Sequence, residues 1–174
     1  LILKAVPADR YLLGYHIPGM AGIGFSPDLV TRLKDAFPNQ FAGIKDSSHD
    51  ADFARSLGKR FGSDLLVLNG TDSYLQLALE NQAGGCITAP ANLISPDLRQ
   101  VWDAYQRGED ASALQERITK IRHILEKYPP FPPMLKALLG KMHGFPTWPV
   151  RPPLEATVPE VVENVMEGLM AASG

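Results

Sequence analysis

Residues 41–48 read Phe-Ala-Gly-Ile-Lys-Asp-Ser-Ser and place one lysine, Lys45, at the end of a short apolar run. A run of this length before polar turn residues is typical of a buried strand. Because burying an ammonium group is costly, three alternatives follow for this lysine. Its amino group reaches water, pairs with a carboxylate such as that of Asp46, or becomes a neutral amine that acts as a nucleophile.

Length and composition indicate one globular domain with a sizeable core, since the 174 residues are 45% hydrophobic and 21% charged. A net charge of −2 with scattered lysines and arginines argues against nucleic acid or an anionic membrane surface as a partner. The single cysteine fits a reducing compartment, and we expect a cytoplasmic protein. No leader typical of a signal peptide precedes the first strand, and a start at Leu1 without methionine is compatible with a longer parent protein.

The first part of the chain alternates between apolar segments, read as strands, and helical segments. The expected strands are 11–17, 41–45, 65–68 and 84–88, and the helices after the first three are 27–37, 50–61 and 73–82. From residue 98 onward the pattern is helical only, with expected helices 98–106, 113–127, 134–143 and 159–172. Alternation of this kind implies parallel strands joined by right-handed crossovers, and therefore an α/β fold.

Helix starts are marked by polar residues followed by proline or acidic residues. Ser26-Pro27-Asp28 predicts an N-cap and first turn, and Ser95-Pro96-Asp97 repeats the same pattern. Thr71-Asp72 is expected to cap the helix 73–82, and residues 19–24 form a glycine-rich loop. Its glycine spacing does not match the dinucleotide fingerprint or a P-loop, which argues against a nucleotide site.

In a parallel sheet the carboxyl ends of the strands share one edge, where functional groups collect. Tyr15 lies near the end of the first expected strand and Lys45 at the end of the second. Neighbouring strands are about 4.8 Å apart, so the two side chains could touch. A neutral lysine attacks a ketone to form an imine, and a neighbouring tyrosine can shuttle protons. The alternative for Tyr15 is a core aromatic before a turn.

Two architectures fit this pattern: an open doubly wound sheet, or the second half of an eight-stranded (β/α) barrel. Four strands cannot close a barrel, and a whole barrel takes about 250 residues. In the second architecture the inner faces of these strands need the first half of the barrel for cover.

Tyr15-His16-Ile17-Pro18, followed by Gly43-Ile44-Lys45-Asp46-Ser47-Ser48, resembles the dihydrodipicolinate synthase / N-acetylneuraminate lyase family in order and spacing. Later segments that resemble the family in the same order are 69–72, 84–87, 91–92 and 150–154. The resemblance covers nearly the whole chain but matches the C-terminal part of the family's TIM barrel. It implies that residues 1–108 are strands 5–8, that 109–174 are a helical extension, and that the first half of the barrel is absent.

By this resemblance Lys45 forms a Schiff base with pyruvate or another 2-oxo acid, and Tyr15 relays protons, in a class I aldolase or lyase without a cofactor. Further positions match residues that line the family's pocket or touch substrate: Ser47, Gly70, Asp72 and Ile87. The second substrate would be an aldehyde or sugar acid. In the family, the residues that bind the pyruvate carboxylate and a second tyrosine of the proton relay belong to the N-terminal half of the barrel, which is missing here. A homo-oligomer is also implied.

Two positions at which this chain departs from the family's residues narrow the choice of substrate. Enzymes that make dihydrodipicolinate carry an arginine where this chain has Met20, and sialic acid lyases carry a glutamate where it has Ser73. Neither lysine biosynthesis nor sialic acid cleavage is therefore expected, which leaves a sugar-acid aldolase, a dehydratase or a hydratase-aldolase. His16 stands where asparagine is usual and bonds either a substrate hydroxyl or the backbone.

Other features of the sequence are read as structural rather than functional. The four histidines are far apart, so no metal site is predicted, and Cys86 in an apolar strand is read as a small core residue. A stripe of Leu114, Ile118, Ile121 and Leu125 is read as packing surface. The hypothesis that competes with an enzyme is a non-catalytic or incomplete relative that binds a 2-oxo acid or plays a structural role.

Overall fold

The computed structural model describes residues 2–7, 9–146 and 148–173. Contacts divide the chain into two compact units, Leu1–Thr88 and Ala89–Gly174. The first unit holds all of the described strands and the second is helical. Each unit is therefore described by itself.

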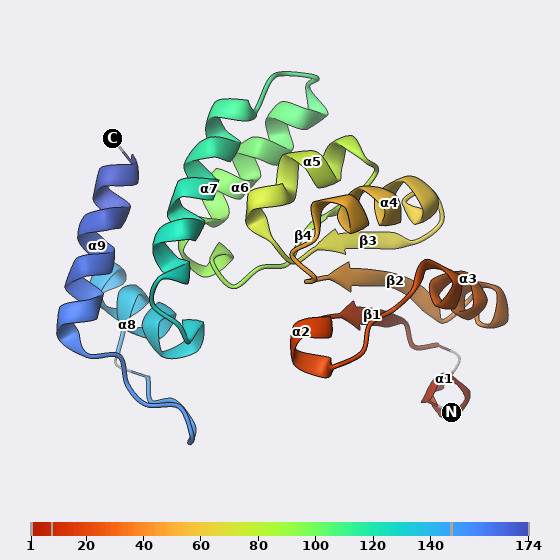
Figure 1. The fold of residues 1–174 in the computed structure, drawn as a ribbon, viewed down its shortest axis with the longest axis horizontal. Helices are drawn as coiled ribbons and strands as arrows, with labels where there is room; N and C mark the ends of the chain where they lie inside the picture. The colour runs from red at the N-terminus through yellow and green to blue at the C-terminus, as the bar shows by residue number, and fades with distance from the viewer. Residues whose placement is uncertain (1, 8, 147, 174) are drawn as a thin grey trace. The chain divides into compact units, whose positions relative to one another are not determined.

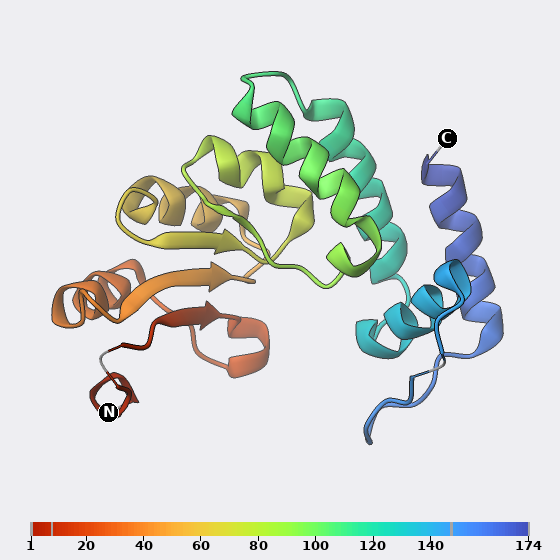
Figure 2. The same ribbon diagram turned by 180° about the vertical axis from the view of Figure 1, so that it is seen from behind.

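A parallel four-stranded sheet forms the centre of the first unit. Its strands are β1 (Leu12–His16), β2 (Phe41–Asp46), β3 (Leu66–Asn69) and β4 (Gly85–Cys86), which lie side by side in chain order. The arrows of β1, β2 and β3 point the same way in Figures 1 and 2. The helical segments of this unit are α1 (Ile2–Ala5), α2 (Pro18–Ala21), α3 (Pro27–Ala36), α4 (Ala51–Phe61), the 3-10 turn η1 (Asp72–Tyr74) and α5 (Leu75–Glu80). The predicted α/β fold with a parallel sheet is confirmed.

Local capping explains where α3 and α4 begin. Ser26 Oγ accepts a hydrogen bond from the backbone N–H of Leu29, as predicted, and Pro27 occupies the first turn of α3. The Asp50 carboxylate caps α4 by accepting from two backbone N–H groups of its first turn. Of the predicted cap Thr71-Asp72, Thr71 lies at the N-cap position, but its side chain makes no capping bond, and the segment starts as the 3-10 turn η1.

Two predicted segments differ from the structure. Residues 18–21 form the short helix α2 directly after β1 (Figure 1), since Pro18 suits a first helical turn and Gly22 ends the helix in the left-handed region at φ 73°. The fourth strand, predicted over 84–88, spans two residues, which pair with the last two residues of β3. Ile87 therefore lies in the loop that follows β4.

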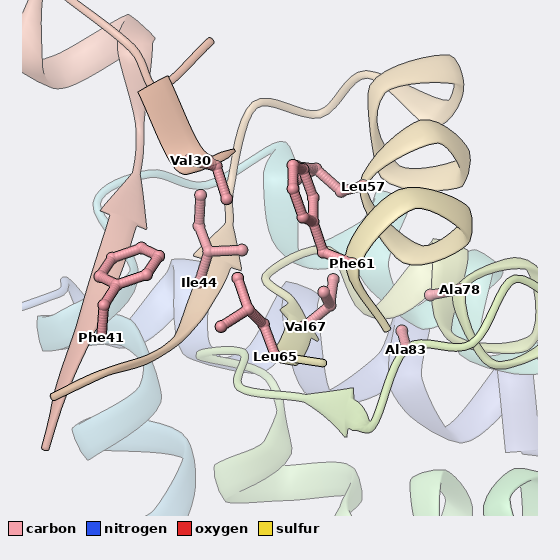
Figure 3. Close-up of a cluster of buried hydrophobic side chains, with 9 residues drawn as sticks. All are labelled: Val30, Phe41, Ile44, Leu57, Phe61, Leu65, Val67, Ala78 and Ala83. Atoms are coloured by element: carbon pink, nitrogen blue, oxygen red, sulfur yellow. The ribbon is translucent and has the colours of Figure 1, made fainter. Parts of the chain in front are cut away.

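The core of the first unit fills the space between one face of the sheet and the helices α3, α4 and α5 (Figure 3). Ile44 from β2, Val30 from α3 and Leu57 from α4 are fully buried there. The whole cluster consists of Val30, Phe41, Ile44, Leu57, Phe61, Leu65, Val67, Ala78 and Ala83. Burial of this apolar surface is the main stabilising term for the unit, at about 25 cal/mol per Å².

The opposite face of the sheet is exposed. Side chains alternate between the two faces of a strand, so the residues beside those of the core point to this second face. Those that are large and hydrophobic are well exposed: Leu13, Tyr15 and Leu66. Exposed hydrophobic side chains on one face of a parallel sheet are unusual, because such sheets are ordinarily covered on both faces.

In its described residues the second unit consists of four helices, α6 (Ala91–Gln106), α7 (Ser112–Glu126), α8 (Phe131–His143) and α9 (Pro159–Ser173). α6 starts earlier than predicted and runs through the expected cap at Ser95, with a kink at Ile94 just before Pro96. The predicted packing stripe on α7 is confirmed for Ile118, Ile121 and Leu125, which are buried, whereas Leu114 is only partly buried. α7 packs against both α6 and α9.

The described residues contain neither a helix suited to a bilayer nor a metal-binding cluster. Within that part of the chain, no helix combines the length and the apolar character that crossing a membrane requires. Among the same residues, no three His, Cys, Asp or Glu side chains lie close enough together to hold a metal ion.

Candidate active site

Tyr15 and Lys45 meet on the exposed face of the sheet. They are directly paired in the register of β1 and β2. The Lys45 Nζ lies 3.3 Å from the Tyr15 Oη and 4.4 Å from the centre of its ring. Tyr15 is 50% exposed and Lys45 is half-buried, so the phenol is open to a small molecule from solvent. The structure thus brings the two predicted catalytic residues together.

Lys45 does not pair with Asp46. The two side chains leave β2 on opposite faces, and Asp46 is buried on the helix side. There its Oδ1 accepts a hydrogen bond from the Ser48 backbone N–H at 2.9 Å and lies 4.0 Å from the His16 Nε2. The ion-pair alternative for Lys45 was therefore wrong, and its amino group is directed to Tyr15.

The phenol of Tyr15 loses its proton more readily than an ordinary tyrosine. Partial burial raises its pKa, but hydrogen bonds with Ser47 and Lys45, together with the positive charge of Lys45, bring the pKa below the usual value of 10.0. Each of these neighbours stabilises the phenolate form. A tyrosine with a lowered pKa is better suited to exchanging protons with a nearby reaction centre.

Ser47 and Gly70 lie against each other at the carboxyl ends of β2 and β3. The Ser47 backbone N–H donates to the His16 carbonyl at 2.7 Å, and that of Gly70 donates to the Asp46 carbonyl at 2.6 Å. A Cβ atom at residue 70 would lie 2.0 Å from the Ser47 Oγ. Glycine is therefore required at 70 to leave room for the serine hydroxyl. Ser47 and Gly70 thus lie just past the carboxyl ends of the strands β2 and β3, the same edge of the sheet near which Tyr15 and Lys45 lie.

The other two residues predicted to bind substrate have different surroundings. Asp72 is fully buried, and its Oδ1 accepts a hydrogen bond from the Thr88 Oγ1 at 3.1 Å. Ile87 is exposed, and its backbone N–H donates to the Asn69 carbonyl at 2.8 Å, just past β4. The buried carboxylate has a clear structural role in tying η1 to the end of the sheet. Substrate contacts for Asp72 and Ile87 stay predictions.

His16 supports the backbone rather than facing the exposed side of the sheet. Its Nδ1 accepts a hydrogen bond from the Phe25 backbone N–H at 2.8 Å, and its ring stacks on Phe53 with centroids 4.4 Å apart. A Cβ atom at Gly24 would come within 2.5 Å of the ring. Of the two alternatives for His16, the bond to the backbone is confirmed. It holds the segment that follows α2 against the sheet.

His49 is a further residue at this edge of the sheet, and sequence reasoning did not select it. It adopts φ 61°, a left-handed conformation that is uncommon for residues other than glycine. Its Nδ1 lies 3.4 Å from the Thr71 Oγ1, and its carbonyl accepts from the Tyr74 Oη at 3.4 Å. These contacts connect the loop after β2 with the loop after β3, and no local pattern in the sequence predicts them.

Cys86 is expected to react slowly with alkylating agents. Burial, reinforced by the negative charge of Asp72, raises the pKa of its thiol to about 11. Because the thiolate is the reactive form, the native protein should consume iodoacetamide at pH 8 at least about tenfold more slowly than the urea-unfolded chain, and the rate should rise with pH up to that value. Equal rates in the two states would contradict this placement of Cys86.

Comparison with known proteins gives the family. The sequence profile of the Dihydrodipicolinate synthetase family matches residues 5–172. A protein of Chloroflexus aurantiacus described as an uncharacterized DapA-like lyase is 33% identical over 153 residues, which is 88% of this chain and 50% of that protein. A 4-hydroxy-tetrahydrodipicolinate synthase of Thermus thermophilus is 33% identical over 169 residues, covering 94% of this chain and 54% of that protein.

Solved structures give the same result for the fold. The crystal structure of dihydrodipicolinate synthase from Agrobacterium tumefaciens superimposes with a TM-score of 0.81 at 32% identity. The match covers 94% of this chain and 54% of that one. This chain therefore spans about half the length of the relatives that it matches.

Proposed function

This chain belongs to the dihydrodipicolinate synthetase family, and on that basis we propose that Lys45 forms a Schiff base with pyruvate or a related 2-oxo acid. The reaction is that of a cofactor-independent class I aldolase or lyase. The observation that carries the proposal is the 3.3 Å distance between the Lys45 Nζ and the Tyr15 Oη on adjacent strands. An amine beside a readily ionised phenol has what imine formation needs, a nucleophile and a proton carrier.

The steps follow from this pair. The neutral Lys45 amine adds to the C2 carbonyl of the 2-oxo acid, and the resulting carbinolamine hydroxyl leaves as water after Tyr15 supplies a proton. The protonated imine withdraws electrons, so the neighbouring carbon loses a proton and becomes an enamine. In the synthetic direction the enamine carbon then adds to the carbonyl carbon of an aldehyde and forms a carbon–carbon bond. In the cleavage direction, breaking that carbon–carbon bond leaves the enamine. Water finally releases the product and restores Lys45.

We further propose that residues 1–108 are strands 5–8 of a (β/α)8 barrel and that residues 109–174 are its helical extension. The exposed sheet face would then be the inner face of the barrel, with Tyr15 and Lys45 on it. The N-terminal half of the barrel would cover that face and supply the residues that bind the pyruvate carboxylate. The half-length match to the relatives supports this assignment, and a homo-oligomer of complete barrels is part of the same proposal.

The second substrate is proposed to be an aldehyde or a sugar acid without a second carboxylate. Met20 on α2 is 85% exposed and offers no positive charge for such a group. The glutamate expected for sialic acid cleavage is replaced by Ser73. A sugar-acid aldolase, a dehydratase and a hydratase-aldolase are the three activities that fit, with Ser47, Gly70, Asp72 and Ile87 at the substrate end of the site.

Borohydride reduction in the presence of pyruvate tests the proposal. We expect the intact mass to increase by one reduced pyruvate adduct, and peptide mapping should place that adduct on Lys45. Borohydride without pyruvate is the control for non-specific modification. Absence of an adduct from folded protein, with a separately expressed N-terminal barrel half of a relative added, would contradict the Schiff-base reaction.

A second candidate function is binding of a 2-oxo acid without turnover. The half-exposed position of Tyr15 favours it as long as this face of the sheet stays uncovered, because active sites for imine chemistry ordinarily exclude water. Borohydride trapping combined with acylation of Lys45 in the presence and absence of pyruvate separates the two functions. Pyruvate that protects Lys45 from acylation but leaves no borohydride adduct would identify a binding protein.

A further inference from the structure

The short helix α2 lies at the carboxyl edge of the sheet, directly after β1 (Figures 1 and 2). It begins three residues after Tyr15 and carries Met20, whose uncharged side chain is part of the proposed choice of substrate. None of its residues is buried, and its closing bond, from the Gly22 N–H to the Pro18 carbonyl at 2.9 Å, stays within the helix. The position of α2 therefore depends on the chain segments at its two ends.

After α2 the chain is anchored to the sheet through His16. Residues 22–24 are exposed, and the Phe25 backbone N–H then donates to the His16 Nδ1 at 2.8 Å. The loop also touches the ring, since a Cβ atom at Gly24 would come within 2.5 Å of it. The ring itself is fixed, because His16 is 7% exposed and stacks on Phe53 with centroids 4.4 Å apart.

The bond to Phe25 requires a neutral His16 ring. A ring nitrogen accepts a hydrogen bond only through a free lone pair, so Nδ1 is unprotonated and Nε2 carries the proton. Nε2 lies 4.0 Å from the Asp46 Oδ1 on β2. On α4, Phe53 carries no charge, and the Asp50 carboxylate accepts from the backbone of the first turn. A second proton, on Nδ1, would remove the acceptor for the loop and place a positive charge near Asp46.

We propose that His16 is a positioning residue for substrate selection, because its neutral ring fixes the loop after α2 and with it the place of Met20 near the end of β1. Protonation of the ring opens the bond to Phe25 and releases α2. The inference rests on the proposed Schiff-base function and names the residue that sets its choice of second substrate. Asparagine, which is usual at this position in the family, does not take up a proton and provides no such control.

The part of the substrate that α2 selects is the part attached to C3 of the 2-oxo acid. In the proposed reaction C3 is the enamine carbon that bonds to the aldehyde, so substituents on C3 occupy the place of the second substrate. The longer 2-oxo acid 2-oxohexanoate therefore probes this place, whereas pyruvate does not reach it. Both acids form their imine at Lys45, so the ratio of their trapping rates at one pH does not depend on how far Lys45 or Tyr15 is ionised.

NMR of the full chain tests the anchor without any need for turnover. The protein is labelled with ¹⁵N in phenylalanine and histidine, and the signals are assigned by their loss in Phe25→Leu and His16→Asn. We expect the Phe25 amide signal to shift with the same pH midpoint as the His16 ring signals, and to show no such step in His16→Asn. At neutral pH, hydrogen exchange of the Phe25 amide should be about tenfold faster in His16→Ala, which lacks the acceptor.

Borohydride trapping under the conditions of the pyruvate test measures selection. In the native chain, the trapping rate of pyruvate relative to 2-oxohexanoate should fall at least about threefold as the pH is lowered through the His16 titration, because released α2 admits the longer acid. The ratio should be constant with pH in His16→Asn and low at every pH in His16→Ala. The matched control is His123→Asn, an exposed histidine of α7, which should behave as the native chain does.

The outcomes separate this inference from the proposed reaction. A Phe25 amide signal that does not follow the His16 ring, or an unchanged exchange rate in His16→Ala, would overturn the anchor. A Phe25 signal that follows the ring while the trapping ratio stays constant would overturn the role in substrate selection. If the signal follows the ring in a chain that traps neither acid, the anchor stands and the Schiff-base reaction fails together with the selection. Circular dichroism at each pH confirms that every variant is folded.

Discussion

Lys45→Ala is expected to abolish the pyruvate-dependent borohydride adduct and to reduce any aldolase turnover by more than about 10³-fold. Alanine has no amine, so the imine cannot form at the position that faces Tyr15. Loss of a covalent nucleophile is among the largest single effects in enzyme catalysis. Intact-mass analysis after reduction measures the adduct directly, and it requires no knowledge of the second substrate.

The control for this variant is Lys34→Ala, which removes a lysine of α3 whose amino group pairs with Asp64. It should trap pyruvate as well as the native chain does. Lys45→Ala should also raise the Tyr15 pKa, because it removes both a hydrogen bond and a positive charge that favour the phenolate. The phenolate absorbance would then appear at a higher pH. Pyruvate trapping that survives in Lys45→Ala would show that another amine is the nucleophile.

The pairing of Tyr15 with Lys45 could be predicted because it depends on strand order alone. Two consecutive strands joined by one helix lie next to each other and parallel, so residues near their carboxyl ends come together. The cap of α3 by Ser26 was equally predictable, since it is a bond between residues three apart. Features that follow from spacing within one element, or between neighbouring elements, are thus accessible from sequence.

Features that depend on tertiary packing could not be predicted in the same way. The hydrogen bond that the buried Asp72 carboxylate accepts from Thr88 joins residues sixteen positions apart, and nothing in the sequence pattern indicated it. The clearance between Ser47 and Gly70 depends on the backbone distance between two strand ends. His16 was assigned to the backbone only once the position of Phe25 was known. In each case the deciding partner lies on another element, and its distance is set by the packing of the whole unit.

Leu57→Ala is expected to lower the free energy of unfolding by about 2–5 kcal/mol, because Leu57 is fully buried and the truncation leaves a cavity between α4 and the sheet (Figure 3). That is a large share of the roughly 5–15 kcal/mol typical of a whole domain. Urea denaturation followed by circular dichroism measures the change. A loss below about 1 kcal/mol would show that this core does not hold the unit together.

Leu66→Ala is the matched control, and it also tests the state of the exposed sheet face. Leu66 belongs to β3, the strand that contributes Val67 to the core, but it is 47% exposed. In the chain alone its truncation should cost less than about 1 kcal/mol, since the lost side chain was half in water already. Were the cost to equal that of Leu57→Ala, something would already cover this face, and a second copy of the chain would be the first candidate. Alternatively, Leu66→Ala is nearly neutral in the chain alone and becomes costly once an N-terminal barrel half is bound. In that case the face that carries Tyr15 and Lys45 becomes buried in the complete barrel, as the barrel assignment requires.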